Sequence, residues 1–231
     1  MVVSRRLFAA GIICAALCLG TGHQTVTLAF AQGAKPPAPT ASQVQVDLLR
    51  GLADIFSRGM DTLTDKLNRQ GYSARVYSTN GWQAVARRIA EQYVRGQKTI
   101  VVVIGHSLGA DATFQIANTL NAQNIPIELI VTFDATNPQP VPKNVLHFVN
   151  FYQNNGFGKK VLPAPDFKGE LSNVDLTADS SLSHTTIEKS PRLHALVVQK
   201  IADIVDKDLA DKIAASKPKN KKPKPVKQSV K

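Results

Sequence analysis

A run of β-branched residues that ends in a glycine-rich turn constrains the fold of this chain more than any other feature. Residues 99–104 read TIVVVI, and residues 105–109 follow as GHSLG. A helix-forming segment comes directly afterwards. Strand, tight turn and helix in this order are the setting of a G-x-S-x-G nucleophile elbow, in which the serine projects from a sharp turn at the end of a strand. Ser107 is therefore a candidate nucleophile, and the alternative is a serine that only caps the helix.

The first 31 residues have the features of an export signal. Arg5 and Arg6 precede a short apolar run at 7–19, and residues 29–31 read AFA, which fits an A-x-A cleavage site. The arginine pair is compatible with either a Sec or a twin-arginine signal. An uncleaved signal anchor is the alternative. We expect a mature chain that begins at Gln32 and is periplasmic or secreted.

The chain then divides into an Ala/Pro linker at 32–42, a single domain at 43–215 and a basic tail at 216–231. The net charge is +11, but two signal arginines and seven tail lysines supply nine of these charges. The domain itself is nearly neutral, so its charge does not indicate specific nucleic acid binding. The proline-interrupted tail is expected to be disordered. It either solubilises the protein or makes weak contact with an anionic membrane or envelope polymer.

Cysteine and histidine usage argues against a metal or cofactor site. Both cysteines, Cys14 and Cys18, lie in the signal segment, so the mature chain is expected to have neither a disulfide nor a thiolate metal site. The sequence contains no H-E-x-x-H and no G-x-G-x-x-G that follows a strand. We therefore expect neither a metal nor a cofactor.

Apolar segments alternate with helical patterns along the domain. Five strands and four helices are predicted, with no clear period at 154–183; the strands are 44–49, 74–77, 99–104, 127–133 and 145–151, and the helices are 60–70, 82–95, 108–120 and 191–206. Apolar inner strands between helices predict a parallel sheet that is covered on both faces. In such sheets the active site lies at the carboxyl ends of the strands.

Asp134 is the candidate acid of a serine-based triad. A serine becomes a nucleophile at neutral pH through a base beside it, and an acid orients that base. Asp134 directly follows the apolar strand at 127–133, where a carboxylate needs a partner or caps the proline-containing turn behind it. Three further acids lie in the later loop and remain as rivals: Asp166, Asp175 and Asp179.

His184 is the candidate base. The expected chain order in this architecture is serine, acid, histidine. His184 follows the long loop and precedes the last predicted helix, so its ring can reach the sheet edge. His194 is the alternative, but it lies inside that helix beside the apolar face, where a packed histidine is more typical. His106 is expected to point away from the substrate side, and His147, within a strand, is expected to be structural.

Backbone N–H groups are the candidates for an oxyanion hole. One is the N–H of Leu108, directly after the nucleophile, and the other comes from the loop after the first strand. Gly51 lets that loop turn inward, which makes the N–H of Leu52 the first candidate and that of Ala53 the second. Ser57 and Arg58, in the same loop, either line the mouth of the site or belong to a solvated loop.

On these motifs the chain resembles the α/β-hydrolase superfamily, and more closely its small bacterial lipase- or thioesterase-like members. The resemblance covers 44–206 and rests on GHSLG at 105–109, Phe133-Asp134 and Ser183-His184. It implies a single-domain α/β sandwich, with a mostly parallel sheet of five to six strands and helices on both faces. It also implies a Ser107–Asp134–His184 triad and an acyl-enzyme intermediate.

Two positions depart from the pattern of the superfamily. The acid follows an earlier strand than in most members, as in some lipases, and the first loop lacks the usual His-Gly pair. The expected function is an exported serine hydrolase that cleaves a carboxylic ester or thioester of a small-molecule or lipid acyl substrate. An amidase or peptidase with the same triad and a non-catalytic binding module on this scaffold are the alternatives.

Overall fold

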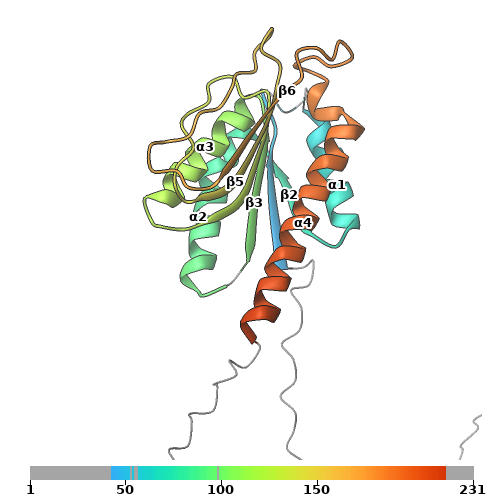
Figure 1. Ribbon diagram of the computed structural model, residues 1–231. Coiled ribbons are helices and arrows are strands. Elements are labelled where there is room, and N and C mark those ends of the chain that lie inside the picture. Colours follow the sequence, from blue (N-terminus) through green and yellow to red (C-terminus); the bar gives the residue numbers. More distant parts are fainter. Residues whose placement is uncertain (1–42, 53, 55–56, 98, 217–231) are drawn as a thin grey trace, which may run out of the picture. The chain divides into compact units, whose positions relative to one another are not determined.

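The computed structural model describes residues 43–52, 54, 57–97 and 99–216, which build a six-stranded, all-parallel sheet in the order β2-β1-β3-β4-β5-β6 (Figure 1). The strands are β1 (Val44–Leu49), β2 (Ser73–Tyr77), β3 (Ile100–His106), β4 (Ile127–Phe133), β5 (Val145–Tyr152) and β6 (Glu170–Asp175). The helices are α1 (Arg58–Arg69), α2 (Trp82–Val94), α3 (Leu108–Asn121) and α4 (Pro191–Ser216), with short 3₁₀ turns η2 (Thr79–Gly81) and η3 (Ile187–Lys189).

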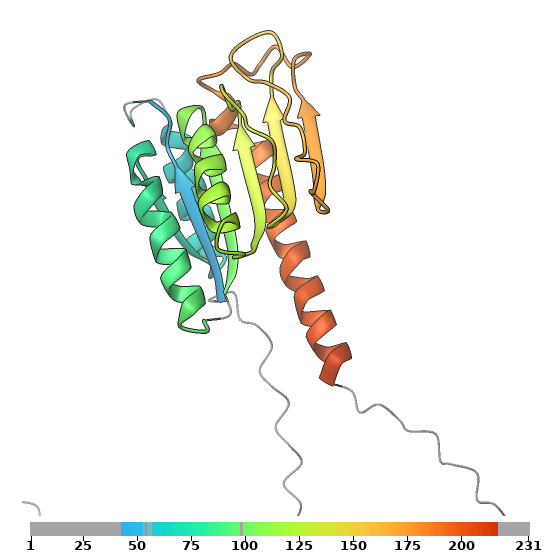
Figure 2. The ribbon, with the colours of Figure 1, turned by 90° about the vertical axis from the view of Figure 1, so that its left-hand side faces the viewer.

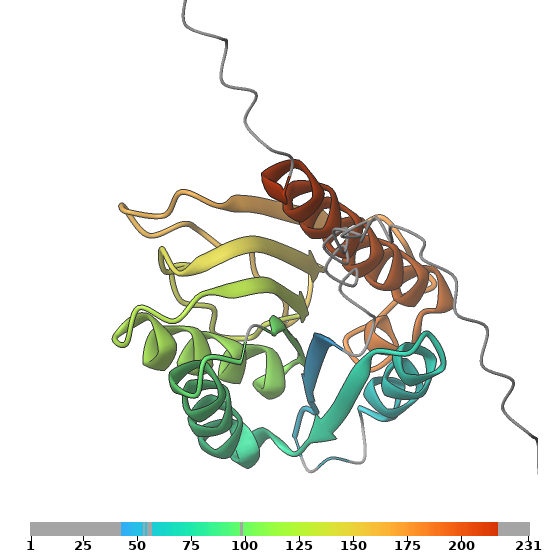
Figure 3. The ribbon, with the colours of Figure 1, turned by 90° about the horizontal axis from the view of Figure 1, so that it is seen from below.

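Two apolar clusters cover the two faces of the sheet, because successive side chains of a strand point to opposite sides. On one face, Val46 and Leu48 of β1 pack with Leu63 of α1 and Ile201 of α4. The other face packs against α2 and α3, which contribute residues such as Phe114. Figure 3 shows the sheet between these two pairs of helices. The predicted parallel α/β fold, with helices on both faces, is confirmed.

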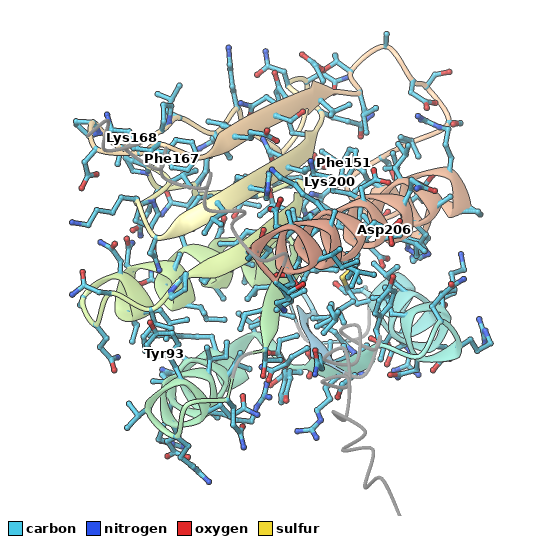
Figure 4. All side chains as sticks on the ribbon, turned by 60° about the horizontal axis from the view of Figure 1, so that its bottom comes forward. Tyr93, Phe151, Phe167, Lys168, Lys200 and Asp206 are labelled. Carbon is cyan, nitrogen blue, oxygen red and sulfur yellow. The ribbon has the colours of Figure 1, made fainter. Side chains whose placement is uncertain are left out.

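The side chains follow the same division. Phe151 of β5 and Lys200 of α4 lie on the side of the sheet that α4 covers, whereas Tyr93 belongs to α2 on the other side (Figure 4). Phe167, in the connection between β5 and β6, packs against the cluster that includes α2 and α3. The long strand-to-strand connections after β4 and β5 therefore help to cover the sheet where no helix does (Figure 2).

Two elements differ from the sequence prediction. The segment 154–183, in which no period was evident, contains β6, and the last helix continues past the predicted end at residue 206 to Ser216. β6 pairs only with β5 and has no buried residue, so the alternation of apolar residues that marks a half-buried strand is weak there. Beyond Ile204 the side chains of α4 are partly or fully exposed, so the apolar stripe fades before the helix ends.

The predicted signal at 1–31, the linker at 32–42 and nearly all of the basic tail lie outside the described residues. Among the described helices, none combines the length and the apolar composition that crossing a bilayer requires. The described residues also contain no group of three or more His, Cys, Asp or Glu side chains placed to hold a metal ion.

Candidate active site

Ser107 sits in a strained turn between β3 and α3. Its φ is 55° and its ψ is −124°, a conformation that a residue with a Cβ rarely adopts. A Cβ on Gly105 would come within 2.3 Å of the Gly109 carbonyl oxygen, and one on Gly109 within 2.4 Å of the Leu49 and Arg50 carbonyl oxygens. Glycine is thus needed at both positions for α3 to pack closely against β3 and β1. Local geometry matches the elbow that the pentapeptide predicts.

Asp134 lies at the end of β4, beside Ser107 at the carboxyl edge of the sheet. Its side chain is buried, and its backbone also has a positive φ, of 49°. The Gln153 N–H donates to Oδ1 over 2.8 Å, which holds one carboxylate oxygen in place. Gly158 packs so closely on this carboxylate that a Cβ there would lie 2.1 Å from Oδ1. The other oxygen, Oδ2, faces His184.

His184 bridges the serine and the aspartate. Its Nδ1 is 3.2 Å from Asp134 Oδ2, and its Nε2 is 2.9 Å from Ser107 Oγ. Since a carboxylate accepts, Nδ1–H donates to Asp134, and Nε2 then accepts the hydroxyl proton of Ser107. The ring of Phe157 lies against the ring of His184, with 4.7 Å between centroids. The structure therefore brings together the three side chains predicted from the sequence.

The rival acids make their contacts elsewhere. Asp166 faces Lys143 at 3.9 Å, Asp175 binds Thr177, and Asp179 pairs with Arg192 at 2.7 Å. The rival base, His194, is fully buried on the inner face of α4, where its Nε2 donates to the Glu188 carbonyl oxygen over 2.7 Å. His147 contacts Glu170 at 3.0 Å across neighbouring strands. None of these contacts involves the Ser107–Asp134–His184 group.

The two residues whose N–H groups are predicted to form the oxyanion hole border one small pocket. Leu52 and Leu108 both border a hollow of about 160 Å³, together with Gly51, Asp54, Ser78, Thr79 and Asn80. The N–H of Leu108 belongs to the first turn of α3, where an N–H has no acceptor within its own helix. Two larger hollows, of about 560 and 530 Å³, lie against α2 and at the opposite ends of the strands, away from Ser107.

Ser57 does not lie where it was expected, and His106 makes contacts that the sequence did not predict. Ser57 is fully buried and does not line the mouth of the site, whereas Arg58 is exposed. The Ser57 hydroxyl lies 2.7 Å from His106 Nδ1 and accepts the Gly51 N–H over 2.8 Å. His106 Nε2 lies 2.8 Å from the His184 carbonyl oxygen. The sequence did not indicate these contacts, because they join segments that are far apart along the chain.

Burial determines the charge of two groups near the Ser107–Asp134–His184 triad, the imidazole of His106 and the carboxyl of Glu188. It lowers the pKa of His106 to about 4, against the smaller opposing effect of the hydrogen bond to His184, so the ring is neutral at neutral pH. Burial also raises the pKa of Glu188, four residues after His184, to about 7. The carboxyl of Glu188 lies near the first residues of α1, whose N–H groups oppose this rise in its pKa.

Several solved structures are similar to this chain. One is a protein from Xanthomonas campestris pv. campestris assigned to the α/β superfamily of hydrolases, at 18% identity, 68% coverage of this chain, 99% of that one, and a TM-score of 0.37. Another is the RedJ thioesterase of prodiginine biosynthesis in Streptomyces coelicolor, at 12% identity, 73% and 91% coverage, and a TM-score of 0.45. A third is an esterase domain from Rhodothermus marinus, at 14% identity, 70% and 89% coverage, and a TM-score of 0.40.

All three TM-scores are below 0.5, so neither the family of this chain nor its substrate follows from these likenesses. No protein-family model matches the chain, and no curated protein matches it.

Proposed function

We propose that this protein is a serine hydrolase that cleaves carboxylic esters or thioesters through an acyl-serine intermediate. The observation that carries the proposal is the position of His184, hydrogen-bonded to Ser107 Oγ at 2.9 Å and to Asp134 at 3.2 Å. A hydroxyl, an imidazole and a carboxylate in this order are what activation of a serine requires. The exposed side chains of Leu52, Leu108 and Phe157 beside them suit an acyl substrate.

In the first step, Ser107 Oγ attacks the carbonyl carbon while His184 Nε2 takes the hydroxyl proton. Asp134 holds the ring in the required tautomer and stabilises the imidazolium that forms. The N–H groups of Leu108 and Leu52 stabilise the developing oxyanion, and the N-terminal end of α3 adds a favourable dipole. Collapse of the tetrahedral intermediate breaks the bond to the leaving group, which takes the proton from His184.

In the second step, water replaces the leaving group. His184 Nε2 takes a proton from the water, whose oxygen attacks the acyl carbon and forms a second tetrahedral intermediate. When this collapses, the Ser107 Oγ–acyl bond breaks and His184 returns the proton to Oγ. A carboxylic acid leaves, and the enzyme is regenerated.

The proposal is tested by reaction with a fluorophosphonate probe. The folded wild type is expected to label, and Ser107→Ala to lose all labelling while its melting temperature stays close to that of the wild type. His184→Ala should lose nearly all hydrolysis of p-nitrophenyl esters. His194→Ala, which replaces the fully buried histidine of α4, should retain turnover. A folded wild type that neither labels nor hydrolyses esters would overturn the proposal and leave the non-catalytic binding module as the alternative.

We further propose that the protein is exported, on the basis of the arginine pair, the apolar run and the AFA site within residues 1–31. N-terminal sequencing of protein recovered from the periplasm or the medium is expected to start at Gln32. Retention of residues 1–31 in the recovered protein would favour an anchor over a cleaved signal.

A further inference from the structure

The side chain of His106 connects two loops that the proposed mechanism uses. Along this connection, the Gly51 N–H donates to Ser57 Oγ over 2.8 Å, and Ser57 Oγ lies 2.7 Å from His106 Nδ1. On the other side of the ring, Nε2 lies 2.8 Å from the His184 carbonyl oxygen. Gly51 and His184 are far apart in the sequence, and these contacts reach both of them from the residue next to Ser107.

The chemistry of the partners determines the direction of each hydrogen bond. A carbonyl oxygen only accepts, so Nε2 carries the hydrogen and donates to His184. In a neutral ring Nδ1 then accepts, and the Ser57 hydroxyl donates to it. The oxygen of the same hydroxyl also accepts a hydrogen bond from the Gly51 N–H. Burial keeps the ring in this neutral form at neutral pH, since it lowers the pKa of His106 to about 4.

Both ends of this connection lie next to groups with a proposed role in catalysis. Gly51 precedes Leu52, the proposed oxyanion donor, and a Cβ on Gly51 would come within 3.0 Å of the Ser107 Cβ. At the other end, the accepted carbonyl belongs to His184 itself, the proposed base. A shift of either loop would therefore move a reacting group relative to Ser107.

We propose that His106 is a positioning residue. Through one hydrogen bond on each side of its ring, it holds the loop that contains Leu52 and the loop that contains His184 in place relative to Ser107. The inference rests on the proposed ester hydrolysis. A neutral histidine suits this task because it offers a donor and an acceptor on opposite sides of one rigid ring. An apolar side chain of similar size would fill the same buried space, but it would leave the loops unconnected.

The test compares three substitutions in the full chain. His106→Leu removes both hydrogen bonds, whereas His106→Gln keeps an N–H donor and a carbonyl acceptor on one side chain. His194→Leu is the matched control: it removes a ring N–H that donates to a backbone carbonyl over 2.7 Å, in another buried site. kcat and KM for a p-nitrophenyl ester, fluorophosphonate labelling rate and melting temperature are measured for each.

His106→Leu is expected to lower kcat roughly a hundredfold, the loss that a misplacement of about 1 Å can cause. KM should change little, because the interactions lost are with the catalytic groups rather than with the substrate. His106→Gln should recover most of kcat. His194→Leu should lower the melting temperature without a comparable loss of kcat.

Ser57→Ala tests the same connection from its other partner and serves if His106→Leu fails to fold. It should lower kcat on its own. Where His106→Leu folds, the double variant Ser57→Ala/His106→Leu should lower kcat by less than the product of the two single effects, since both substitutions remove the hydrogen bond between Ser57 and His106. The positioning role would be overturned if His106→Leu or Ser57→Ala kept the wild-type kcat, or if His194→Leu lost as much kcat as His106→Leu. As long as the wild type is labelled by the probe, these outcomes leave the proposed function intact. A wild type without labelling or turnover would overturn both.

Discussion

At the scale of single residues, most of the described non-glycine residues with a strained backbone lie at the candidate site. The described non-glycine residues with positive φ are Asp54, Ser107, Asn124 and Asp134. Ser107 and Asp134 belong to the proposed triad, and Asp54 lies in the loop of the proposed oxyanion donor. Such conformations cost roughly 1–3 kcal/mol each, and they persist where the surroundings hold them. Asparagine and aspartate adopt positive φ more readily than most other residues, so the strain is clearest at Ser107.

The close contact between Gly158 and Asp134 leads to a prediction about activity. In Gly158→Ala the new Cβ would meet Asp134 Oδ1 at 2.1 Å, so the carboxylate or the loop around residue 158 has to shift, which disturbs the contact between Asp134 and His184. We expect a loss of kcat of at least tenfold, on the order of the losses that misplaced catalytic groups cause. The measurement is kcat for a p-nitrophenyl ester, with circular dichroism to check folding.

Gly156→Ala is the control for this prediction. A Cβ at that position would meet only the Gln153 carbonyl oxygen, at 4.0 Å, so the substitution should leave kcat unchanged. Equal activity in both variants would show that the carboxylate of Asp134 tolerates displacement.

The triad residues could be predicted from the sequence because each occupies a position that the order of the chain defines. Ser107 follows a buried strand, Asp134 follows the next one, and His184 precedes the last helix. Ser57 and His106 could not be identified in this way, because their partners are brought together only by the folding of distant segments. Gly158 gave no sequence signal, since its role depends on how closely one loop approaches another.

At the scale of elements, the sequence predicted buried segments more accurately than exposed ones. The inner strands β1, β3 and β4 are almost completely buried and were predicted nearly to the residue. The edge strand β6, with no buried residue, was not predicted, and α4 was predicted too short where its side chains become exposed. Periodicity reports the apolar face of an element and says little where that face is absent.

The uneven burial of α4 leads to a prediction about stability. Ile201 is fully buried against the sheet, whereas Ile213, on the same helix, is only partly buried. Ile201→Ala should cost about 2–5 kcal/mol in the free energy of unfolding, because it removes buried methyl groups and leaves a cavity. Ile213→Ala should cost less than about 1 kcal/mol. Urea denaturation of both variants measures the difference, and similar costs would mean that the distal end of α4 is anchored as firmly as its centre.

At the scale of the whole domain, we expect stability to depend on pH through the buried carboxyl of Glu188. Glu188 has no exposed side-chain surface, and within the described residues neither carboxylate oxygen makes a hydrogen bond. The nearest cation is Lys189, with Nζ 3.8 Å from Oε1, and the carboxylate of Asp61 opposes ionisation. Burial dominates and raises the pKa of Glu188 from the usual 4.5 to about 7.

The sign of the effect follows from the raised pKa. The folded state holds this proton more tightly than the unfolded state, so the stabilisation is fully present below pH 4.5 and is lost as the pH rises through about 7. Glu188→Gln removes the cost of a buried carboxylate. At pH 8.5 we expect it to raise the free energy of unfolding relative to the wild type by roughly 1 kcal/mol.

The measurement is urea denaturation of the wild type and Glu188→Gln at pH 4.5 and pH 8.5. The gain should be absent at the lower pH, where Glu188 is protonated in the folded state. Glu170→Gln is the matched control, because His147 and Lys200 lower the pKa of that exposed carboxyl, so its substitution should not stabilise the protein at pH 8.5. If Glu188→Gln changed stability equally at both pH values, ionisation of Glu188 would not be what links the stability of this domain to pH.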